Sequence, residues 1–225
     1  MIDWFPVFLS IKIATVSTVF ALISGTFLAH ITTKYDFKGK SVLEALVTLP
    51  LVLPPLVTGF LLLMFIGRRG AVGELLFRYF DFQIIFTPYA AVVAGTIVAF
   101  PLMYQSIKTA FLCIDHKFED AARTLGASEL RVFLTISLPL SVNGIVSGTV
   151  MAFSRALGEF GATIMVAGNI AGKTQTIPLA IYFASEADEL ELAGLYVFIL
   201  SIVIFLLVFG LGYWKKSANK EVRHA

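Results

Sequence analysis

Two opposite charges, Arg155 and Glu159, stand four residues apart within an otherwise apolar stretch of the sequence. On a continuous helix, side chains at this spacing share a face and can form an ion pair, which lowers the cost of placing ions among apolar groups. The pair could be structural and fix the orientation of its helix. Alternatively, it could line or gate an anion path, because a guanidinium offers a fork of hydrogen-bond donors to a tetrahedral oxyanion.

No arrangement of residues in the sequence predicts catalysis. The segment from Gly168 to Thr174 looks like a phosphate-binding loop, but the G-x-x-x-x-G-K-[ST] spacing requires glycine where Ala167 stands. The three histidines are scattered, and the single cysteine, Cys113, can form neither an internal disulfide nor a metal site alone. We therefore predict a protein that is not an enzyme and that itself binds no metal or cofactor.

The composition indicates a membrane protein. Hydrophobic residues make up 58% of the 225 positions and charged residues 14%, and the mean hydropathy is +0.87. Soluble domains are only about half apolar and about a quarter charged, so a soluble globular domain is excluded. A net charge of +2 is too small to indicate nucleic-acid binding. We predict a single transmembrane domain over residues 1–225.

Apolar runs long enough to cross a membrane follow one another along the chain. A helix needs about 20 apolar residues to cross the hydrocarbon core, and these runs lack the alternating pattern of barrel strands. The sequence therefore predicts an all-α integral membrane protein with about five spans. The predicted spans cover residues 5–31, 43–66, 86–112, 132–157 and 192–214.

The segment after the fourth predicted span is ambiguous. Residues 158–183 are apolar in patches but are interrupted by glycine, asparagine and proline, so they could re-enter the membrane or form the outer end of the fourth span. Charge bias favours five spans, because inner loops collect Lys and Arg and a sixth span would move the basic tail outside. The expected topology has the N-terminus outside, an external loop at about 168–191 and the C-terminus in the cytoplasm.

Proline interrupts the second predicted span at Pro50, Pro54 and Pro55. Because proline removes a helical hydrogen bond, these residues could produce ordinary kinks, or they could break the helix beside a polar pathway as in transporters. Gly144 and Gly148 have the GxxxG spacing that lets helices approach closely. The candidate residues of a translocation path or gate are Pro54, Pro55, Thr58, Ser154, Arg155 and Glu159.

A long polar segment, residues 113–131, separates the third and fourth predicted spans on the expected inner side. Its alanine and leucine content favours a short helix, which Gly126 should end. Such a helix could be pushed by a soluble partner, or the segment could be only a solvated connector.

This segment resembles a signature of ABC importer permeases. In that family E-A-A is followed after three residues by G, and after nine more by I-x-L-P. This chain has Asp120-Ala121-Ala122, Gly126 and Ile136-Ser137-Leu138-Pro139 at the same spacings, with Asp120 in place of the usual glutamate. The resemblance implies a type I ABC importer permease fold, in which the short helix is a coupling helix that docks into the ATP-hydrolysing subunit. The implied coupling residues are Glu119, Asp120, Ala121, Ala122, Arg123, Leu125, Gly126 and Ala127.

Other motifs resemble those of the molybdate, tungstate and sulfate importer permeases. They lie at residues 49–55, 67–70, 121–127, 157–164 and 172–178, and the resemblance covers about residues 5–214. It implies a homodimer in a bacterial or archaeal plasma (inner) membrane that imports molybdate by alternating access. The implied partners are two cytoplasmic subunits that use ATP and Mg, and an external molybdate-binding protein, periplasmic or lipid-anchored. Sulfate or tungstate is the alternative substrate, and an ATP-independent anion channel or carrier is the alternative mechanism.

Overall fold

The computed structural model describes residues 3–224, with side chains as far as Trp214, and this part of the chain contains helices and connecting segments without strands. Three helices are long and apolar enough to cross a membrane: α1 (Phe5–Lys34), α5 (Pro88–Leu112) and the Leu190–Trp214 part of α12 (Leu190–His224). Up to five spans result if each of two bent helix pairs counts as one span. The all-helical fold predicted from the apolar runs is thus confirmed.

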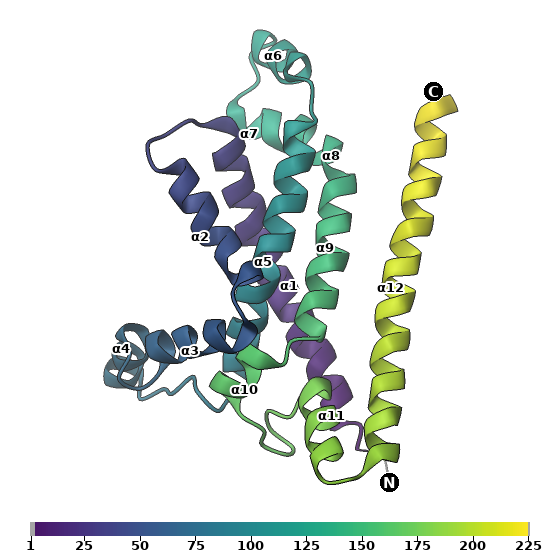
Figure 1. The fold of residues 1–225 in the computed structure, drawn as a ribbon. Coiled ribbons are helices and arrows are strands. Elements are labelled where there is room, and N and C mark those ends of the chain that lie inside the picture. Colours follow the sequence, from purple (N-terminus) through teal and green to yellow (C-terminus); the bar gives the residue numbers. More distant parts are fainter. Residues whose placement is uncertain (1–2, 225) are drawn as a thin grey trace.

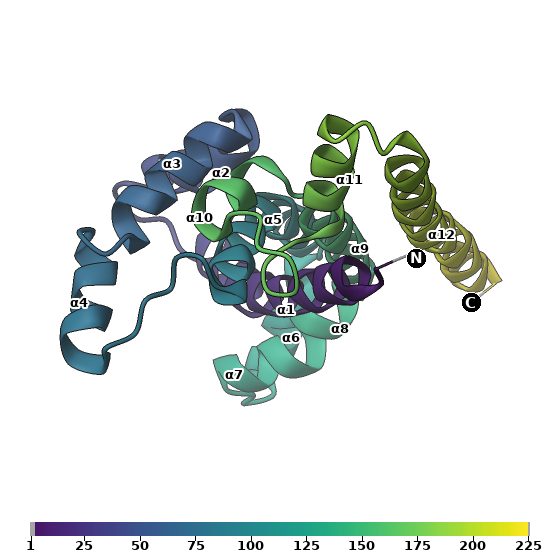
Figure 2. The ribbon, with the colours of Figure 1, turned by 90° about the horizontal axis from the view of Figure 1, so that it is seen from below.

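The long helices run between two ends of the molecule (Figure 1). We call one end the α6 end, after the helix His116–Thr124, and the other the α10 end, after the helix Gly161–Ala167. The N-terminus lies at the α10 end and the C-terminus at the α6 end. Viewed from the α10 end, α1 and α5 lie centrally with α9 (Val142–Leu157), whereas α12 stands to one side of them (Figure 2).

The second predicted span, residues 43–66, is not one straight helix. It consists of α2 (Lys40–Val52) and α3 (Pro55–Ile66), which are bent by 118° relative to each other. The break follows from the prolines, because Pro54 and Pro55 donate no backbone hydrogen bond and the residue before a proline favours an extended conformation, as Leu53 has. Pro50 lies inside α2 without ending it. After α3 the chain continues into α4 (Ala71–Phe80).

The fourth predicted span, residues 132–157, also departs from a single helix. The chain runs through α7 (Glu129–Val132), a π-helical turn η1 (Phe133–Ser137) and α8 (Leu138–Leu140) before α9, with a bend of 69°. Proline at position 139 has no N–H and crowds the preceding turn, and a widened π turn relieves that conflict. The signature sequence Ile136–Pro139 therefore coincides with an irregular part of the helix.

The ambiguous residues 158–183 do not form a further span. They contain α10 and the first part of α11 (Ile177–Glu186), and both helices are too short to cross the hydrocarbon core. Both lie at the α10 end (Figure 1). The expected external loop at 168–191 thus contains one complete short helix, α11, between the end of α10 and the start of α12.

Small residues bring α5 and α9 into close contact, as the GxxxG spacing predicts. A Cβ added at Gly144 would lie 2.3 Å from the Ala110 Cβ, and one added at Gly148 would lie 3.1 Å from the Met103 sulfur. The same Met103 side chain also contacts α1, where a Cβ added at Gly25 would lie 3.2 Å from the Met103 Cγ. Gly25, Met103 and Gly148 therefore lie at the same height along the bundle of the three central helices, α1, α5 and α9.

Candidate functional site

The predicted short helix between the third and fourth spans is α6, at the exposed tip of the α6 end (Figure 1). The Asp115 side chain begins it by accepting a hydrogen bond of 3.0 Å from the Lys117 N–H. Gly126 ends it as expected: with φ +84° it adopts the left-handed conformation, and the N–H groups of Gly126 and Ala127 donate to the carbonyls of Arg123 and Ala122.

Apolar side chains on and directly after α6 are exposed. Leu125 is 88% exposed and Phe118 59% exposed. Among the other expected coupling residues, Asp120 and Ala121 are exposed, whereas Ala122 and Ala127 are half-buried. Large exposed apolar groups beside charged ones on a water-facing helix are typical of a surface that binds another protein.

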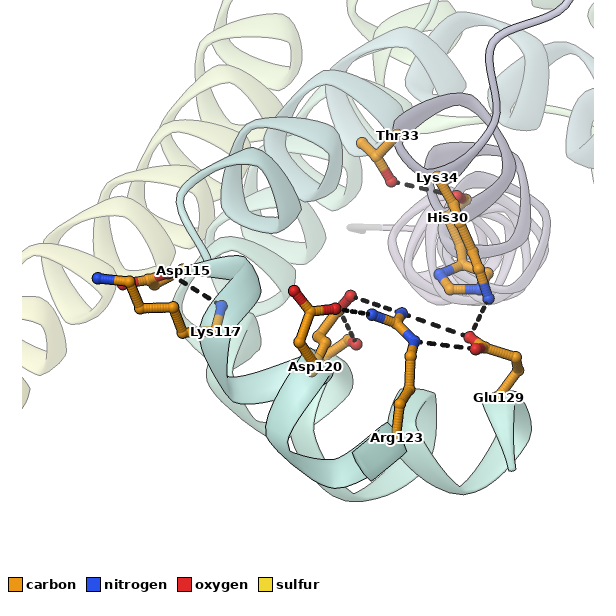
Figure 3. Close-up of polar contacts among 10 residues, drawn as sticks. His30, Thr33, Lys34, Asp115, Lys117, Asp120, Arg123 and Glu129 are labelled. Carbon is orange, nitrogen blue, oxygen red and sulfur yellow. Dashed lines mark hydrogen bonds and ion pairs between the residues drawn. The ribbon is translucent and has the colours of Figure 1, made fainter. Parts of the chain in front are cut away.

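Arg123 lies at the centre of a network of ion pairs that joins α6 to neighbouring elements (Figure 3). Within α6 its guanidinium contacts Asp120 at 2.7 Å and Glu119 at 3.0 Å. Its Nε also donates to Glu129 Oε1, at the start of α7, over 2.9 Å. The expected coupling residues Glu119, Asp120 and Arg123 are therefore held as one cluster.

Two contacts extend the cluster to the long helices. Glu129 also pairs with Lys34, the last residue of α1. The Glu119 carboxylate accepts a hydrogen bond of 2.6 Å from the Ser137 hydroxyl in η1. Hydrogen bonds from Arg123 and then Lys34 lower the pKa of Glu129 to about 2, and the same contact with Glu129 raises the pKa of Arg123. The α6 helix is thus connected by polar contacts to α1 and to the beginning of the fourth span.

Sequence reasoning identified Arg123 but missed Lys34, Glu129 and Ser137 as its direct or indirect partners. Lys34 and Glu129 are 95 residues apart in the chain. The only sequence signal is that each lies close to an expected span end, where charged residues are common, and this does not specify a partner.

Arg155 and Glu159 form the predicted ion pair. Arg155 Nη1 lies 2.6 Å from Glu159 Oε2, and the Glu159 side chain is only 2% exposed whereas that of Arg155 is 29% exposed. The other Glu159 oxygen accepts a hydrogen bond of 2.7 Å from the Ala162 N–H in the first turn of α10. Glu159 therefore joins the end of α9 to the beginning of α10, as a structural pair would.

The other expected path residues divide between two elements. Pro54 and Pro55 are exposed at the break before α3, whereas Thr58 is buried. The start of α3 packs closely on α10: a Cβ added at Gly161 would lie 2.7 Å from the Pro55 Cβ. Pro55 and Thr58 are therefore brought close to the Glu159 segment. Ser154 lies in α9, one turn before Gly158, and neither its hydroxyl nor that of Thr58 has a hydrogen-bond partner among the described residues.

A polar groove between α5 and α9 was not predicted from the sequence. It has a volume of about 590 Å³. The residues that line it are Gln105, Ser106, Thr109, Ala110, Cys113, Leu140, Asn143, Gly144 and Ser147. The signal that could have found it is the spacing of four between Gln105 and Thr109, and between Asn143 and Ser147, which places polar groups on one face of each helix.

The loop that resembles a phosphate-binding loop follows α10. Its turn is closed by the Ile170 N–H, which donates to the Thr174 hydroxyl over 3.0 Å. No strand precedes it in residues 3–224, whereas a phosphate-binding loop follows one. Within the same residues no group of three or more His, Cys, Asp or Glu side chains could hold a metal ion.

Solved structures of bacterial transporters share this fold. The chain superposes on a chain of a bacterial ABC transporter that imports alginate with a TM-score of 0.74, at 15% identity, over 95% of this chain and 78% of the other. With a chain of the MetNI methionine ABC transporter in an inward-facing conformation the TM-score is 0.70, at 16% identity, over 94% of each chain. The fold is therefore that of a type I ABC importer permease, a multi-pass membrane protein.

The sequence comparisons define the family. Residues 18–220 match the family model described as binding-protein-dependent transport system inner membrane component. The chain is 42% identical to the molybdenum transport system permease protein ModB of Escherichia coli K12, over 97% of this chain and 96% of that protein. It is 43% identical to ModB of Haemophilus influenzae, over 95% and 94%. The chain belongs to the family of binding-protein-dependent transport system inner membrane components. It is a non-catalytic permease subunit, and ATP hydrolysis takes place in partner subunits.

Proposed function

We propose that the chain is the membrane-spanning subunit of an ATP-driven molybdate importer. The observation that carries this proposal is its similarity, over nearly the whole length of both chains, to permeases named for molybdenum transport. A relative named as a probable sulfate permease, from Prototheca wickerhamii, is 34% identical over 89% of this chain and 78% of that protein. The lower identity and coverage favour molybdate over sulfate.

The α6 end faces the cytoplasm in this proposal. The basic residues at that end include Lys34, Lys38, Lys40, Lys108, Lys117, Arg123 and Arg131. Fewer basic residues lie at the α10 end, among them Arg68, Arg69, Arg78 and Lys173. Because cytoplasmic loops collect Lys and Arg, this distribution supports an N-terminus outside and a C-terminus inside.

We propose that α6 docks onto a cytoplasmic ATPase subunit, which uses ATP and Mg. The exposed Leu125 and Phe118 would enter a hollow of that subunit, and the ion pairs around Arg123 would hold the helix in position. When the two ATPases approach each other on ATP binding, a push on α6 reaches α1 through Glu129 and Lys34, and η1 through Glu119 and Ser137. These contacts support a movement of the long helices that opens the outer side of the permease. Hydrolysis of ATP would then reopen the inner side.

The working unit is a homodimer with the anion path between its two copies. A polar groove on the face of a single chain supports this arrangement, because polar groups at membrane depth face protein or a water-filled space. Each copy would carry one ATPase subunit, and an external binding protein would deliver the anion at the α10 end.

Uptake of labelled molybdate tests the function. Vesicles would contain the chain with its ATPase partner, with ATP on the α6 side, binding protein on the other side, and sulfate as competitor. We expect uptake that requires ATP and resists excess sulfate. Uptake abolished by sulfate would change the substrate to sulfate, and uptake indifferent to ATP would indicate a channel or carrier.

Substitution of Leu125 tests the docking role of α6. Leu125→Ser removes an exposed apolar group whose burial against a partner stabilises by about 1.5–3 kcal/mol, so ATP-dependent uptake should fall about tenfold or more. The control is Leu130→Ser, since Leu130 is 68% exposed but borders a groove against α1 instead of lying on α6. Equal effects of the two substitutions would exclude a specific docking role for Leu125.

A further inference from the structure

The polar groove between α5 and α9 is an open surface groove that runs along both helices. On the α5 side its lining residues run from Gln105 in α5 to Cys113, the residue directly after α5, which is about 12 Å along a helix at 1.5 Å per residue. At the end further from α6, Gly148 follows Ser147 directly and lies at the level of Met103 and Gly25 in the central helices. The groove thus extends from the α6 end well into the length of α5.

The groove side chains offer hydrogen-bonding groups that find no partner among the described residues. Gln105, Thr109 and Asn143 are exposed, and their side-chain polar atoms bond to no other described residue. The Ser147 hydroxyl donates to the Asn143 carbonyl over 2.6 Å, so its oxygen can still accept. Several unsatisfied polar groups in contact with hydrocarbon would each cost several kcal/mol, about 2–7 kcal/mol per group. The groove must therefore face water, a polar ligand or another protein surface, and not hydrocarbon.

The polar face of α9 continues toward the expected gate. Asn143, Ser147 and Ser154 are spaced by four and seven residues and share one face of the helix. The Ser154 hydroxyl is buried without a partner among the described residues. The next turn carries the pair of Arg155 and Glu159 at the α10 end. A line of polar groups thus connects the groove with the residues that the sequence had marked as path candidates.

We propose that Gln105, Ser106, Thr109, Asn143 and Ser147 form a hydrated site that contacts the transported tetrahedral oxyanion in the α6 half of the path. This inference rests on the proposed function and specifies its site. The volume of about 590 Å³ accommodates such an anion with several waters, since one water occupies about 30 Å³ in the liquid. The lining contains amides and hydroxyls, which donate hydrogen bonds, and no carboxylate that would repel an anion.

A site made of neutral donors also suits the passage of an anion. Neutral groups donate hydrogen bonds to the anion but carry no net positive charge, so they add no coulombic attraction of the kind a cation would add. A guanidinium or ammonium at the same place would bind more tightly and slow release into the cytoplasm. The nearest cationic side chain along α5, Lys108, is instead paired with Glu44 of α2 at 2.6 Å.

Single cysteines provide the test. In the complete transporter in vesicles, with Cys113→Ser as background, Ser147→Cys and Gln105→Cys report from the groove. Ser24→Cys is the matched control, because Ser24 precedes Gly25 at the same level of the bundle and is exposed on α1. Each variant is treated from the α6 side with a charged sulfonate-bearing thiosulfonate or with the membrane-soluble N-ethylmaleimide, and labelling of this chain is measured by mass spectrometry.

We expect the sulfonate reagent to label Ser147→Cys and Gln105→Cys at least about tenfold faster than Ser24→Cys, since the reactive thiolate forms in water and not in lipid. Molybdate at millimolar concentration should slow the two groove reactions several-fold. Labelling by N-ethylmaleimide alone would place the groove against lipid, and no labelling by either reagent would indicate dry packing between copies. Sulfonate labelling without protection by molybdate would indicate water without anion contact. Each of these three results overturns the proposal.

The isosteric substitution Asn143→Asp provides a functional readout. A carboxylate in the groove would repel the anion, so molybdate uptake should fall about tenfold, whereas labelling of Ser147→Cys in the same background should shift toward cationic reagents. Unchanged uptake would contradict the site. Uptake by the wild-type transporter is measured in the same vesicles. If wild type takes up molybdate in an ATP-dependent way while the groove fails these tests, only the proposed site is wrong. If the groove is labelled and protected but uptake selects another oxyanion, only the proposed substrate is wrong.

Discussion

The two ends of the molecule are held together by different kinds of contact. At the α6 end, exposed and half-exposed charges around Arg123 connect α6 to Glu129, and through it to α1. At the α10 end, α3 and α10 pack with almost no space between their backbones, and one buried carboxylate, Glu159, joins α9 to α10. Exposed ion pairs each contribute only about 0–1 kcal/mol, whereas close packing tolerates little change in position. The α6 end can therefore be moved by a partner, while the α10 end keeps its geometry.

The largest expected effect comes from Glu159 at the α10 end. Glu159→Ala leaves Arg155 unpaired and the Ala162 N–H without its acceptor, which should destabilise the protein by about 3 kcal/mol, the lower part of the range for breaking a buried pair. Thermal unfolding of the purified transporter measures it. Glu159→Gln retains an acceptor for Ala162 and should cost less. If both variants unfold like wild type, the pair does not stabilise this end.

Close packing at the α10 end predicts the next effect. A Cβ at Gly59 would lie 2.8 Å from the Ala162 Cα, which is backbone and cannot move aside easily. Gly59→Ala should therefore destabilise by about 1–3 kcal/mol despite the better helix propensity of alanine. The matched control is Gly210→Ala in α12, where nothing lies within 4 Å of the added Cβ and a small stabilisation is expected. Thermal unfolding of both variants decides whether α3 and α10 are tightly packed in the membrane.

Two glycines in the left-handed backbone conformation, one at each end of the molecule, allow a direct comparison of the two ends. Gly126 at the α6 end has φ +84° and Gly172 at the α10 end has φ +69°, and neither has an atom within 4 Å of an added Cβ. Substitution by alanine should cost about 1–2 kcal/mol locally at each position. Only Gly126→Ala should reduce uptake per ATP hydrolysed, because it loosens the end of α6. A similar loss of coupling in Gly172→Ala would mean that the effect does not arise at α6.

The ion-pair network at the α6 end predicts a smaller and more local effect. Glu129→Gln weakens the contacts of α7 with Arg123 and Lys34, so amide hydrogen exchange in residues 116–124 should become a few times faster while the melting temperature changes little. Glu191→Gln, at the start of α12 and exposed, is the control. Unchanged exchange in α6 would show that packing, and not the ion pairs, holds this helix.

The smallest effect is expected from acidification. Because the pKa of Glu129 is lowered to about 2, its contribution to stability is complete above its ordinary value near 4.5, declines progressively below that value and is gone below about pH 2. Between pH 7 and pH 4.5 the network should stay intact. Infrared spectroscopy measures the ionisation of Glu129 through the carboxylate band that is present in wild type and absent in Glu129→Gln. Loss of that band before pH 4 would contradict the strong contacts of Glu129.

Much of the local structure was predictable from the sequence. The helix α6 and its end at Gly126, the pairing of Arg155 with Glu159 and the break at Pro54 all depend on residues within a few positions of one another. Helical periodicity, proline geometry and glycine conformation act over this short range, so local patterns suffice to predict them.

The contacts between distant segments were decided only by the tertiary structure. They include the direction of α3 after its bend of 118°, the pairing of Lys34 with Glu129 and the groove formed where Gln105 faces Asn143. The sequence determined by itself that this is an all-helical membrane protein with a short helix ending at Gly126 and a helix break at Pro54. Apolar run length and local backbone chemistry act within each segment, which is why the sequence suffices for these features. Packing determined which polar groups share a site, because long helices meet through side chains far apart in the chain and small residues such as Gly148 set how closely they approach.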